Sequence, residues 1–203
     1  LRDRDRGRRA GEASRLSVTL YNKVVRLLNV CSPRSIPVTI RPMANSKSLF
    51  TFGYEGLTLE AFINRLKETG VRTIIDVREL PLSRKKGFSK RAFAEALHIN
   101  GIAYAHMPAL GCPKTIRDAY RKDGNWLAYT RKFMVYLNQQ NGAIAEVAKI
   151  ARATNACLVC FEADFNHCHR SMVARAAACA GGPAVVHLTA RTAIPEVPAR
   201  AAA

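Results

Sequence analysis

The sequence predicts an α/β domain in which five mostly parallel strands form a sheet flanked by helices, a Rossmann-like three-layer arrangement. Short apolar runs alternate with longer amphipathic segments through residues 48–188, which we take as one domain. Adjacent apolar residues such as Ile74 and Ile75 are typical of strands that are buried on both faces, as in a parallel sheet. The order strand, helix, strand recurs at both ends of the domain, and such units join parallel strands through crossover helices.

The elements of the first half follow from local signals. Thr58 is placed to cap a helix whose apolar residues recur at spacings of three and four, and Gly70 is placed to end it. Ser89 precedes a second helix. The expected strands are residues 49–52, 71–77 and 102–107, each apolar and each next to a glycine or proline.

The second half continues with further helices before the fourth strand. Asn125 is placed to cap the first of them, and the aromatic residues along one face of this helix favour a core role over a base-stacking platform. The remaining elements are a helix around residues 144–151, a strand at 156–162, a helix at 170–179 and a strand at 185–188. Residues 189–203 lack a core pattern, so we expect a flexible tail there.

The first 42 residues differ in character from the rest of the chain. They open with a mixed-charge run of low complexity, and Met43 then precedes the first convincing strand. We therefore expect residues 1–42 to be a disordered or non-native leader, with Met43 as the natural start. A basic arm that binds nucleic acid is the alternative interpretation.

The chain is strongly basic, with 32 Lys and Arg, 15 Asp and Glu and a net charge of +17. This charge favours phosphate-bearing partners such as nucleotides or nucleic acid, although solubility alone also explains it. No apolar run approaches the roughly 20 residues of a membrane helix, and no signal peptide is evident. The six cysteines lack the dense spacing of a disulfide scaffold, so we expect a cytoplasmic protein with reduced thiols and no membrane partner. The sequence identifies no cofactor and no oligomeric state.

Polar residues gather where the predicted strands end. In open parallel sheets, ligands bind beyond the carboxyl ends of the strands. After the first three strands these residues are Tyr54, Glu55, Asp76, Arg78, Ser83, Arg84 and His106. At the fourth strand and in the loop after it they are Cys160, Glu162, Cys168, His169 and Arg170. We expect the two groups to meet in one crevice, with Tyr54, Glu55, Asp76, His106 and Cys160 in supporting roles.

The cysteines of the fourth strand and its loop divide into core and site candidates. Cys157 and Cys160 lie three residues apart on an extended strand, so they point to opposite faces and cannot share a metal ion or a disulfide. Cys157 is then a core residue, whereas Cys160 is either a small buried side chain or part of the site. Cys168 precedes a predicted helix between two histidines, where amides and cations favour a thiolate. It is a candidate nucleophile, with an anion-binding or a structural role as alternatives.

Arginines near the expected crevice suit a phosphate group. Guanidinium groups bind phosphate in a bidentate manner, and a helix start adds free amides. The predicted anion-binding residues are Arg78, Arg84, Arg170 and Ser83. A solvated basic face explains the same residues equally simply. Asp76 would orient Arg78, bind a ribose hydroxyl or form a purely structural ion pair.

The predicted catalytic residues are Cys168, Glu162 and His169. Either Cys168 or Glu162 would supply nucleophilic or acid–base chemistry, and His169 or His106 would assist. Metal binding is the alternative use of such side chains, because thiolates and imidazoles are zinc ligands. The candidate ligands are Cys160, Cys168, His106, His167 and His169. They follow no standard zinc spacing, so the main prediction contains no metal site.

Taken together, these motifs resemble the domain-of-unknown-function 488 family. The family's frequent Cys-x-Glu followed by Cys-His-Arg is matched by Cys160, Glu162, Cys168, His169 and Arg170. Its Asp-Val-Arg segment is matched by Asp76, Val77 and Arg78. The similarity covers about residues 49–188 and excludes everything before Met43. The resemblance implies a compact α/β fold and no established reaction.

Three functions remain open from the sequence. The first is an enzyme that acts on a phosphate-bearing substrate, either a nucleotide or a nucleic acid. The second is a non-catalytic nucleic-acid-binding module that uses the same basic edge. The third is a metal-binding or redox protein built on Cys160, Cys168 and the histidines.

Overall fold

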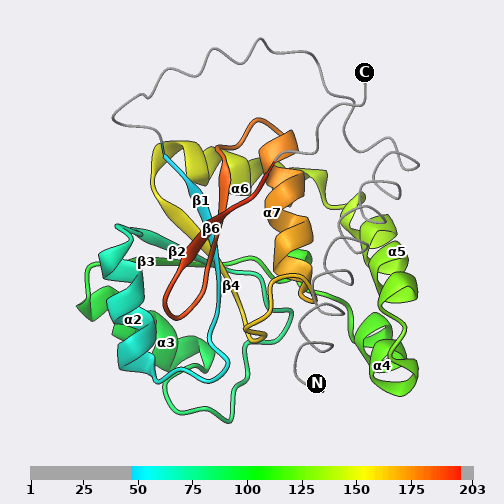
Figure 1. Ribbon diagram of the computed structural model, residues 1–203, viewed down its shortest axis with the longest axis horizontal. Coiled ribbons are helices and arrows are strands. Elements are labelled where there is room, and N and C mark those ends of the chain that lie inside the picture. The colour runs from blue at the N-terminus through cyan, green and yellow to red at the C-terminus, as the bar shows by residue number, and fades with distance from the viewer. Residues whose placement is uncertain (1–46, 198–203) are drawn as a thin grey trace, which may run out of the picture. The chain divides into compact units, whose positions relative to one another are not determined.

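The structure, a computed structural model of the chain, describes residues 47–197. The predicted leader, residues 1–42, lies outside the described residues. The predicted α/β architecture is confirmed, because a mostly parallel sheet lies between helices (Figure 1).

The described sheet has six strands where the sequence predicts five. The strands are β1 (Leu49–Gly53), β2 (Thr73–Asp76), β3 (Ala103–His106), β4 (Ala156–Cys160), β5 (Val185–Leu188) and β6 (Ala193–Pro195). Their order is β3-β2-β4-β1-β5-β6, and all neighbours are parallel except β5 and β6. The chain leaves β1 toward β2 but leaves the adjacent β4 toward β5. The carboxyl ends of β1 and β4 therefore form the topological switch point, where ligands commonly bind in such sheets.

Helices cover both faces of the sheet. They are α2 (Leu59–Glu68), α3 (Lys90–Ile99), α4 (Lys114–Asp123), α5 (Trp126–Leu137), α6 (Asn141–Ala153) and α7 (His169–Cys179). None of these helices is long and apolar enough to cross a membrane. Side chains of α2 and α3 pack with Cys157 and Val159 of β4 in one core cluster. Because side chains alternate along a strand, Cys160 faces the opposite side, where α7 packs against β4. The two thiols thus face opposite sides of the sheet, as predicted.

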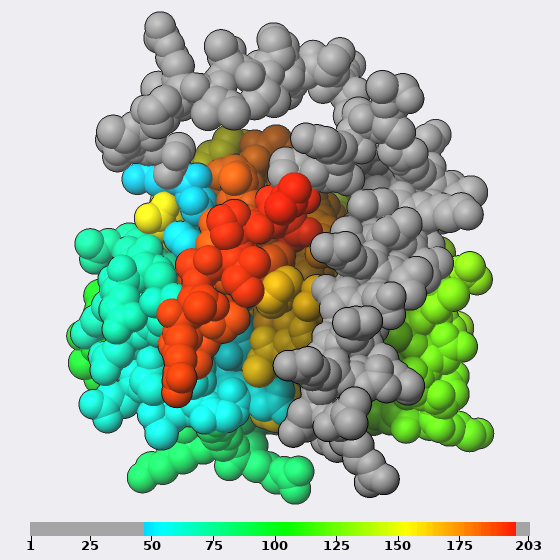
Figure 2. Space-filling model, viewed as in Figure 1, coloured from blue at the N-terminus to red at the C-terminus, as the bar shows by residue number. Residues whose placement is uncertain are grey.

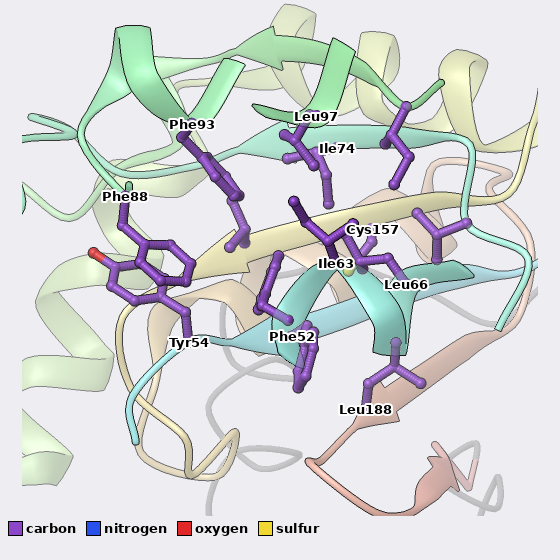
Figure 3. Close-up of a cluster of buried hydrophobic side chains, with 14 residues drawn as sticks. Phe52, Tyr54, Ile63, Leu66, Ile74, Phe88, Phe93, Leu97, Cys157 and Leu188 are labelled. Atoms are coloured by element: carbon purple, nitrogen blue, oxygen red, sulfur yellow. The ribbon is translucent and has the colours of Figure 1, made fainter. Parts of the chain in front are cut away.

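Aromatic rings form much of the core on the α2 and α3 face. Phe52 stacks on Phe62 with ring centroids 4.6 Å apart. Tyr54 stacks on Phe88 with ring centroids 4.2 Å apart (Figure 3). Each fully buried phenylalanine stabilises the fold by about 1.5–3 kcal/mol through its removal from water. Thr58 begins α2 as predicted, because its hydroxyl accepts a hydrogen bond from the amide three residues further on.

Helix α4 is absent from the elements that the sequence predicts. Only three of its ten residues are apolar, Ile116, Ala119 and Tyr120, and none of its residues is buried. Gly124, with a φ of 63°, ends the helix in the left-handed conformation that glycine adopts without strain. Helix α5 begins directly afterwards, because the side chain of Asn125 accepts a hydrogen bond from the amide of Ala128. The predicted cap is therefore confirmed.

Strand β6 lies in the segment that the sequence analysis assigns to a flexible tail. It pairs antiparallel with β5, and the turn between them is closed by a hydrogen bond from the Thr189 amide to the Thr192 carbonyl. Just after β6, Glu196 binds Arg175 of α7 and His187 of β5, with both distances 2.6 Å. The tail prediction is therefore wrong for residues 193–196. All three residues of β6 are exposed, so no apolar pattern marks this strand in the sequence.

Replacing Glu196 with glutamine is expected to lower the free energy of unfolding by about 1–2 kcal/mol near neutral pH. Burial would raise the pKa of Glu196, but its hydrogen bond with His187 and the charge of Arg175 outweigh burial and hold the pKa below its ordinary value. A lowered pKa in the folded state stabilises the fold above the unfolded value of about 4.3 and is lost as the pH falls through the folded value. Urea unfolding at about pH 7 and about pH 3 should show the difference between wild type and Glu196→Gln shrinking at low pH. An undiminished difference at the lower pH would contradict this role of the carboxylate charge.

Candidate metal centre at the carboxyl end of strand β4

Four side chains that can bind metal ions meet where β4 ends. The donor atoms of Cys160, Glu162, Cys168 and His169 all lie within 4.8 Å of one another. Both cysteines and the histidine are buried, whereas Glu162 is partly exposed. Two thiols, an imidazole and a carboxylate are ligand types that zinc-class ions accept in proteins. We call these four residues the donor cluster.

The backbone brings the donor cluster together from one strand end and one helix start. Cys160 is the last residue of β4, whereas Cys168 and His169 are the N-cap and first residue of α7. The loop between them, residues 161–167, carries the glutamate. Arg170 is fully buried and holds this loop by donating hydrogen bonds to two of its backbone carbonyls. Because β4 and α7 are consecutive elements, the loop that joins them lies at the carboxyl end of the sheet.

The end of β1 supports the same loop. A Cβ atom on Gly53 would lie 1.8 Å from the carbonyl oxygen of Glu162, so only glycine permits this close approach. Glu55 accepts a hydrogen bond from the Ala163 amide at 2.9 Å, and its own amide donates to the Phe161 carbonyl at 2.8 Å. The two strand ends at the switch point are thereby tied together, and they present the glutamate of the donor cluster.

Distances within the donor cluster place every group close to at least two others. The sulfur atoms of Cys160 and Cys168 lie 2.8 Å and 3.2 Å from the same carboxylate oxygen, Oε2 of Glu162. The Nδ1 atom of His169 lies 3.7 Å from the first sulfur and 3.9 Å from the second. Four donor atoms therefore surround one small region of space.

The orientation of His169 follows from its second ring nitrogen. Nε2 lies 2.9 Å from the backbone carbonyl oxygen of Val77, which directly follows β2. A carbonyl oxygen only accepts hydrogen bonds, so Nε2 carries a hydrogen. In the neutral imidazole the lone pair is then on Nδ1, the nitrogen that lies near the two sulfurs. Metal-binding histidines are commonly fixed by such a carbonyl on their other nitrogen.

The surroundings of Cys168 favour a thiolate. Burial would raise its pKa, but the hydrogen bond from Cys160, the charge of Arg170 and the contact with His169 outweigh burial and hold the pKa well below its ordinary value. The same hydrogen bond, together with burial, raises the pKa of Cys160. Burial and the charge of Cys168 also raise the pKa of Glu162. Of the two thiols, Cys168 is therefore the one whose surroundings favour the thiolate form.

A buried ion pair lies at the neighbouring end of β2. Arg78 donates hydrogen bonds to both carboxylate oxygens of Asp76, at 2.8 and 2.6 Å, and to the hydroxyl of Tyr54 at 2.9 Å. Tyr104 donates to the same carboxylate at 2.7 Å, and His106 contacts the backbone carbonyl of Arg78 at 2.9 Å. Burial lowers the pKa of Arg78, but the carboxylate more than compensates and raises it above its ordinary value. The buried ion pair is compatible with two of the three interpretations of Asp76, an orienting role for Arg78 and a purely structural pair.

In the part of the chain that the structure describes, no hydrogen bond or ion pair joins the four predicted anion-binding residues to one another. The guanidinium groups of Arg78 and Arg170 point into the protein, with exposed fractions of 7% and 0%. Ser83 accepts a hydrogen bond from Lys85 within its own turn, and Arg84 is exposed. Among the described residues, no hydrogen bond joins either of these two to the donor cluster. Their anion-binding role therefore stays a prediction without a supporting contact.

Comparison with known protein families places this arrangement in context. The sequence model of DUF488, a domain of unknown function, matches residues 58–177, which is more than half of the chain. The chain belongs to the DUF488 family. The resemblance inferred from the sequence motifs is thereby confirmed. No curated protein and no solved structure matches the chain significantly.

The DUF488 match includes the whole donor cluster and the buried ion pair of β2. Strands β1, β5 and β6 of this DUF488 protein lie outside the matched range, although Gly53 at the end of β1 and Glu55 just after it contact the loop of the site. Two further contacts escape sequence reasoning. The contact of Val77 with His169 uses a backbone carbonyl, so the side-chain type at position 77 does not reveal it. Phe133 lies on α5, far from His169 in the sequence, and its ring meets the His169 ring edge-on with centroids 5.5 Å apart.

Proposed function

We propose that this DUF488 protein binds a thiophilic divalent metal ion of the zinc class through its donor cluster. The observation that carries this proposal is the convergence of four donor atoms within 4.8 Å of one another. Thiolate and imidazole ligands favour zinc-class ions over magnesium and calcium, which prefer oxygen ligands. The Nε2 contact of His169 with the Val77 carbonyl supports the proposal, because it directs the free nitrogen toward the sulfurs.

The distances are compatible with four-coordinate binding after a small adjustment. Two ligands of a tetrahedral zinc ion lie about 3.5 Å apart, given zinc–sulfur bonds of about 2.3 Å and zinc–nitrogen bonds of about 2.0 Å. The two sulfur–nitrogen distances, 3.7 and 3.9 Å, are close to this value. The two sulfur–oxygen distances, 2.8 and 3.2 Å, are shorter, so the carboxylate of Glu162 would move outward on binding. Glu162 is the partly exposed member of the donor cluster, whereas the other three members are buried.

Whether Glu162 stays bound or is displaced determines whether the proposed metal site is structural or catalytic. A metal ion held by Cys160, Cys168 and His169 alone would leave its fourth position to water or a substrate in place of Glu162. Three protein ligands with one exchangeable position are typical of catalytic zinc, whereas four fixed ligands are typical of structural zinc. The proposed site thus supports a structural role directly and a catalytic role when Glu162 is displaced.

The other functions that the sequence leaves open have less support. A nucleotide-directed enzyme needs arginines that face the substrate, and the guanidinium groups of Arg78 and Arg170 are instead bound inside the protein. A thiolate nucleophile needs access to its substrate, and Cys168 is only 2% exposed. Metal binding requires neither condition, and we therefore place it first.

Metal analysis of the untagged full chain tests the proposal. After purification under reducing conditions without chelator, we expect about one zinc-class ion per chain. Replacement of this ion by Co²⁺ should produce the intense near-ultraviolet absorption of thiolate bound to cobalt, which magnesium or calcium sites lack. A strong chelator should lower the melting temperature and expose two further thiols to iodoacetamide. A protein without metal that also fails to bind Zn²⁺ or Co²⁺ would contradict the proposal, and rapid alkylation of Cys168 in that protein would favour the nucleophile instead.

A further inference from the structure

A second feature, separate from the donor cluster, is the loop that joins β2 to the first turn of α3. We call residues 80–91 the basic loop. It contains five cations, Arg84, Lys85, Lys86, Lys90 and Arg91. No acidic residue occurs between Glu79 and Glu95, and within residues 47–197 no ion pair involves any of the five cations. Four of them, all except Lys85, are exposed. In the view of Figure 2, the green segment that follows the cyan one protrudes at the lower edge of the molecule.

The basic loop is held in a defined shape by buried anchors. Pro81 and Phe88 are buried, and the Pro81 carbonyl accepts a hydrogen bond from the Lys90 amide at 2.9 Å. The ammonium group of Lys85 binds the Tyr54 carbonyl at 3.1 Å, which ties the loop to the end of β1. The exposed cations thus sit on a backbone that is already ordered, so less conformational entropy is lost when they bind a partner.

Two leucines project from the same loop. Leu80 is 62% exposed and Leu82 is 83% exposed, on either side of the buried Pro81. These two leucines therefore lie in the same short loop as the four exposed cations. Proteins that bind nucleic acid combine these two chemistries, because cations bind the phosphates while apolar side chains contact or separate the bases.

We propose that the basic loop is a contact surface for nucleic acid. Arg84, Lys86, Lys90 and Arg91 would bind successive phosphates, and Leu80 and Leu82 would contact bases or sugars. A phosphate backbone is favoured over an anionic membrane because the cations outnumber the leucines and only two side chains are available for insertion into lipid. The inference does not depend on metal binding by the donor cluster, and the two proposals can fail separately.

Binding of labelled oligonucleotides to the full chain tests this surface. The probes are a DNA duplex of about 20 base pairs and single-stranded DNA and RNA of the same length, followed by fluorescence anisotropy between roughly 50 and 200 mM salt. The double variant Arg84→Ala/Lys86→Ala is expected to bind the best probe roughly tenfold more weakly, with a salt slope shallower by about 1.8 on duplex DNA. The matched control, Arg131→Ala/Lys132→Ala on α5, removes two exposed charges elsewhere and is expected to change affinity less than about twofold. Replacing Leu80 and Leu82 with serine should weaken binding without changing the salt slope.

Several outcomes would overturn the inference. Equal losses in the two charge variants would show that only the overall charge matters. Unchanged affinity in the Arg84→Ala/Lys86→Ala variant would assign binding to another part of the chain. Absence of binding to every probe would also contradict the proposal. Sedimentation with phosphatidylserine vesicles that requires Leu80 and Leu82, without oligonucleotide binding, would assign the loop to a membrane surface. Thermal unfolding of each variant confirms that the fold is intact, and metal content should stay the same throughout.

Discussion

Replacing Cys168 with serine is expected to weaken metal binding by more than about a hundredfold, so that the purified variant contains almost no metal. Cys168 is one of two thiols in the donor cluster, and it is the one whose surroundings favour the thiolate form that binds metal. A serine hydroxyl in its place is a poor ligand for zinc-class ions. Cys160→Ser is expected to have a similar effect, because its sulfur lies at a comparable distance from His169.

The matched control for these variants is Cys157→Ala. Cys157 lies three residues before Cys160 on the same strand but faces the core cluster of α2 and α3. Its replacement should cost some stability and leave about one metal ion per chain. Metal content by mass spectrometry, titration with Zn²⁺ and chelator-dependent melting provide the measurements. Full metal content in Cys168→Ser, or equal metal loss in Cys157→Ala, would show that the donor cluster is not the binding site.

Replacing Asp76 with alanine is expected to lower the free energy of unfolding by about 3–5 kcal/mol. The carboxylate is fully buried and binds the guanidinium group of Arg78, which is 7% exposed, as well as the hydroxyl of Tyr104. Removing one charge leaves the other buried without its partner, and this is far more costly than losing an exposed pair. Because a domain of this size is stable by only about 5–15 kcal/mol, the loss should be large in urea or thermal unfolding.

Two comparisons separate the buried charge from other effects of this substitution. The double variant Asp76→Ala/Arg78→Met removes both charges and should be more stable than Asp76→Ala alone, because no unpaired charge remains. Glu146→Ala removes the exposed partner of Lys149 and should cost less than about 1 kcal/mol. A loss of similar size in all three variants would show that the buried ion pair has no special role.

Much of the fold can be predicted because local patterns carry it. Thr58 and Asn125 cap their helices as expected, and the strand at residues 185–188 has the expected bounds. The strand pattern also places Cys157 and Cys160 on opposite faces, since alternation is a property of extended backbone. Elements that lie outside the core are harder to predict. Helix α4 has no buried residue and only three apolar ones, and β6 has only three residues, all of them exposed.

The candidate site is only partly predictable, because its side-chain types are local whereas its contacts are not. The motifs identify Cys160, Glu162, Cys168 and His169 as candidate site residues. Their spacing along the chain matches no standard zinc-ligand motif, so the sequence alone does not predict a metal site. Convergence of their donor atoms depends on how the loop of residues 161–167 folds back over β1. That path depends on contacts made by Gly53 and Glu55, more than a hundred residues earlier in the chain.

Local sequence patterns were enough to predict the α/β class, most strand and helix positions and the resemblance to the DUF488 family. The directions of the polar side chains depend on the three-dimensional arrangement. It turned Arg78 and Arg170 inward, directed His169 toward two sulfurs and added β6 to the edge of the sheet. The physical reason is that periodicity and capping are read over a few neighbouring residues. The orientation of a buried polar side chain is instead set by hydrogen-bond partners that the sheet brings together from distant strands.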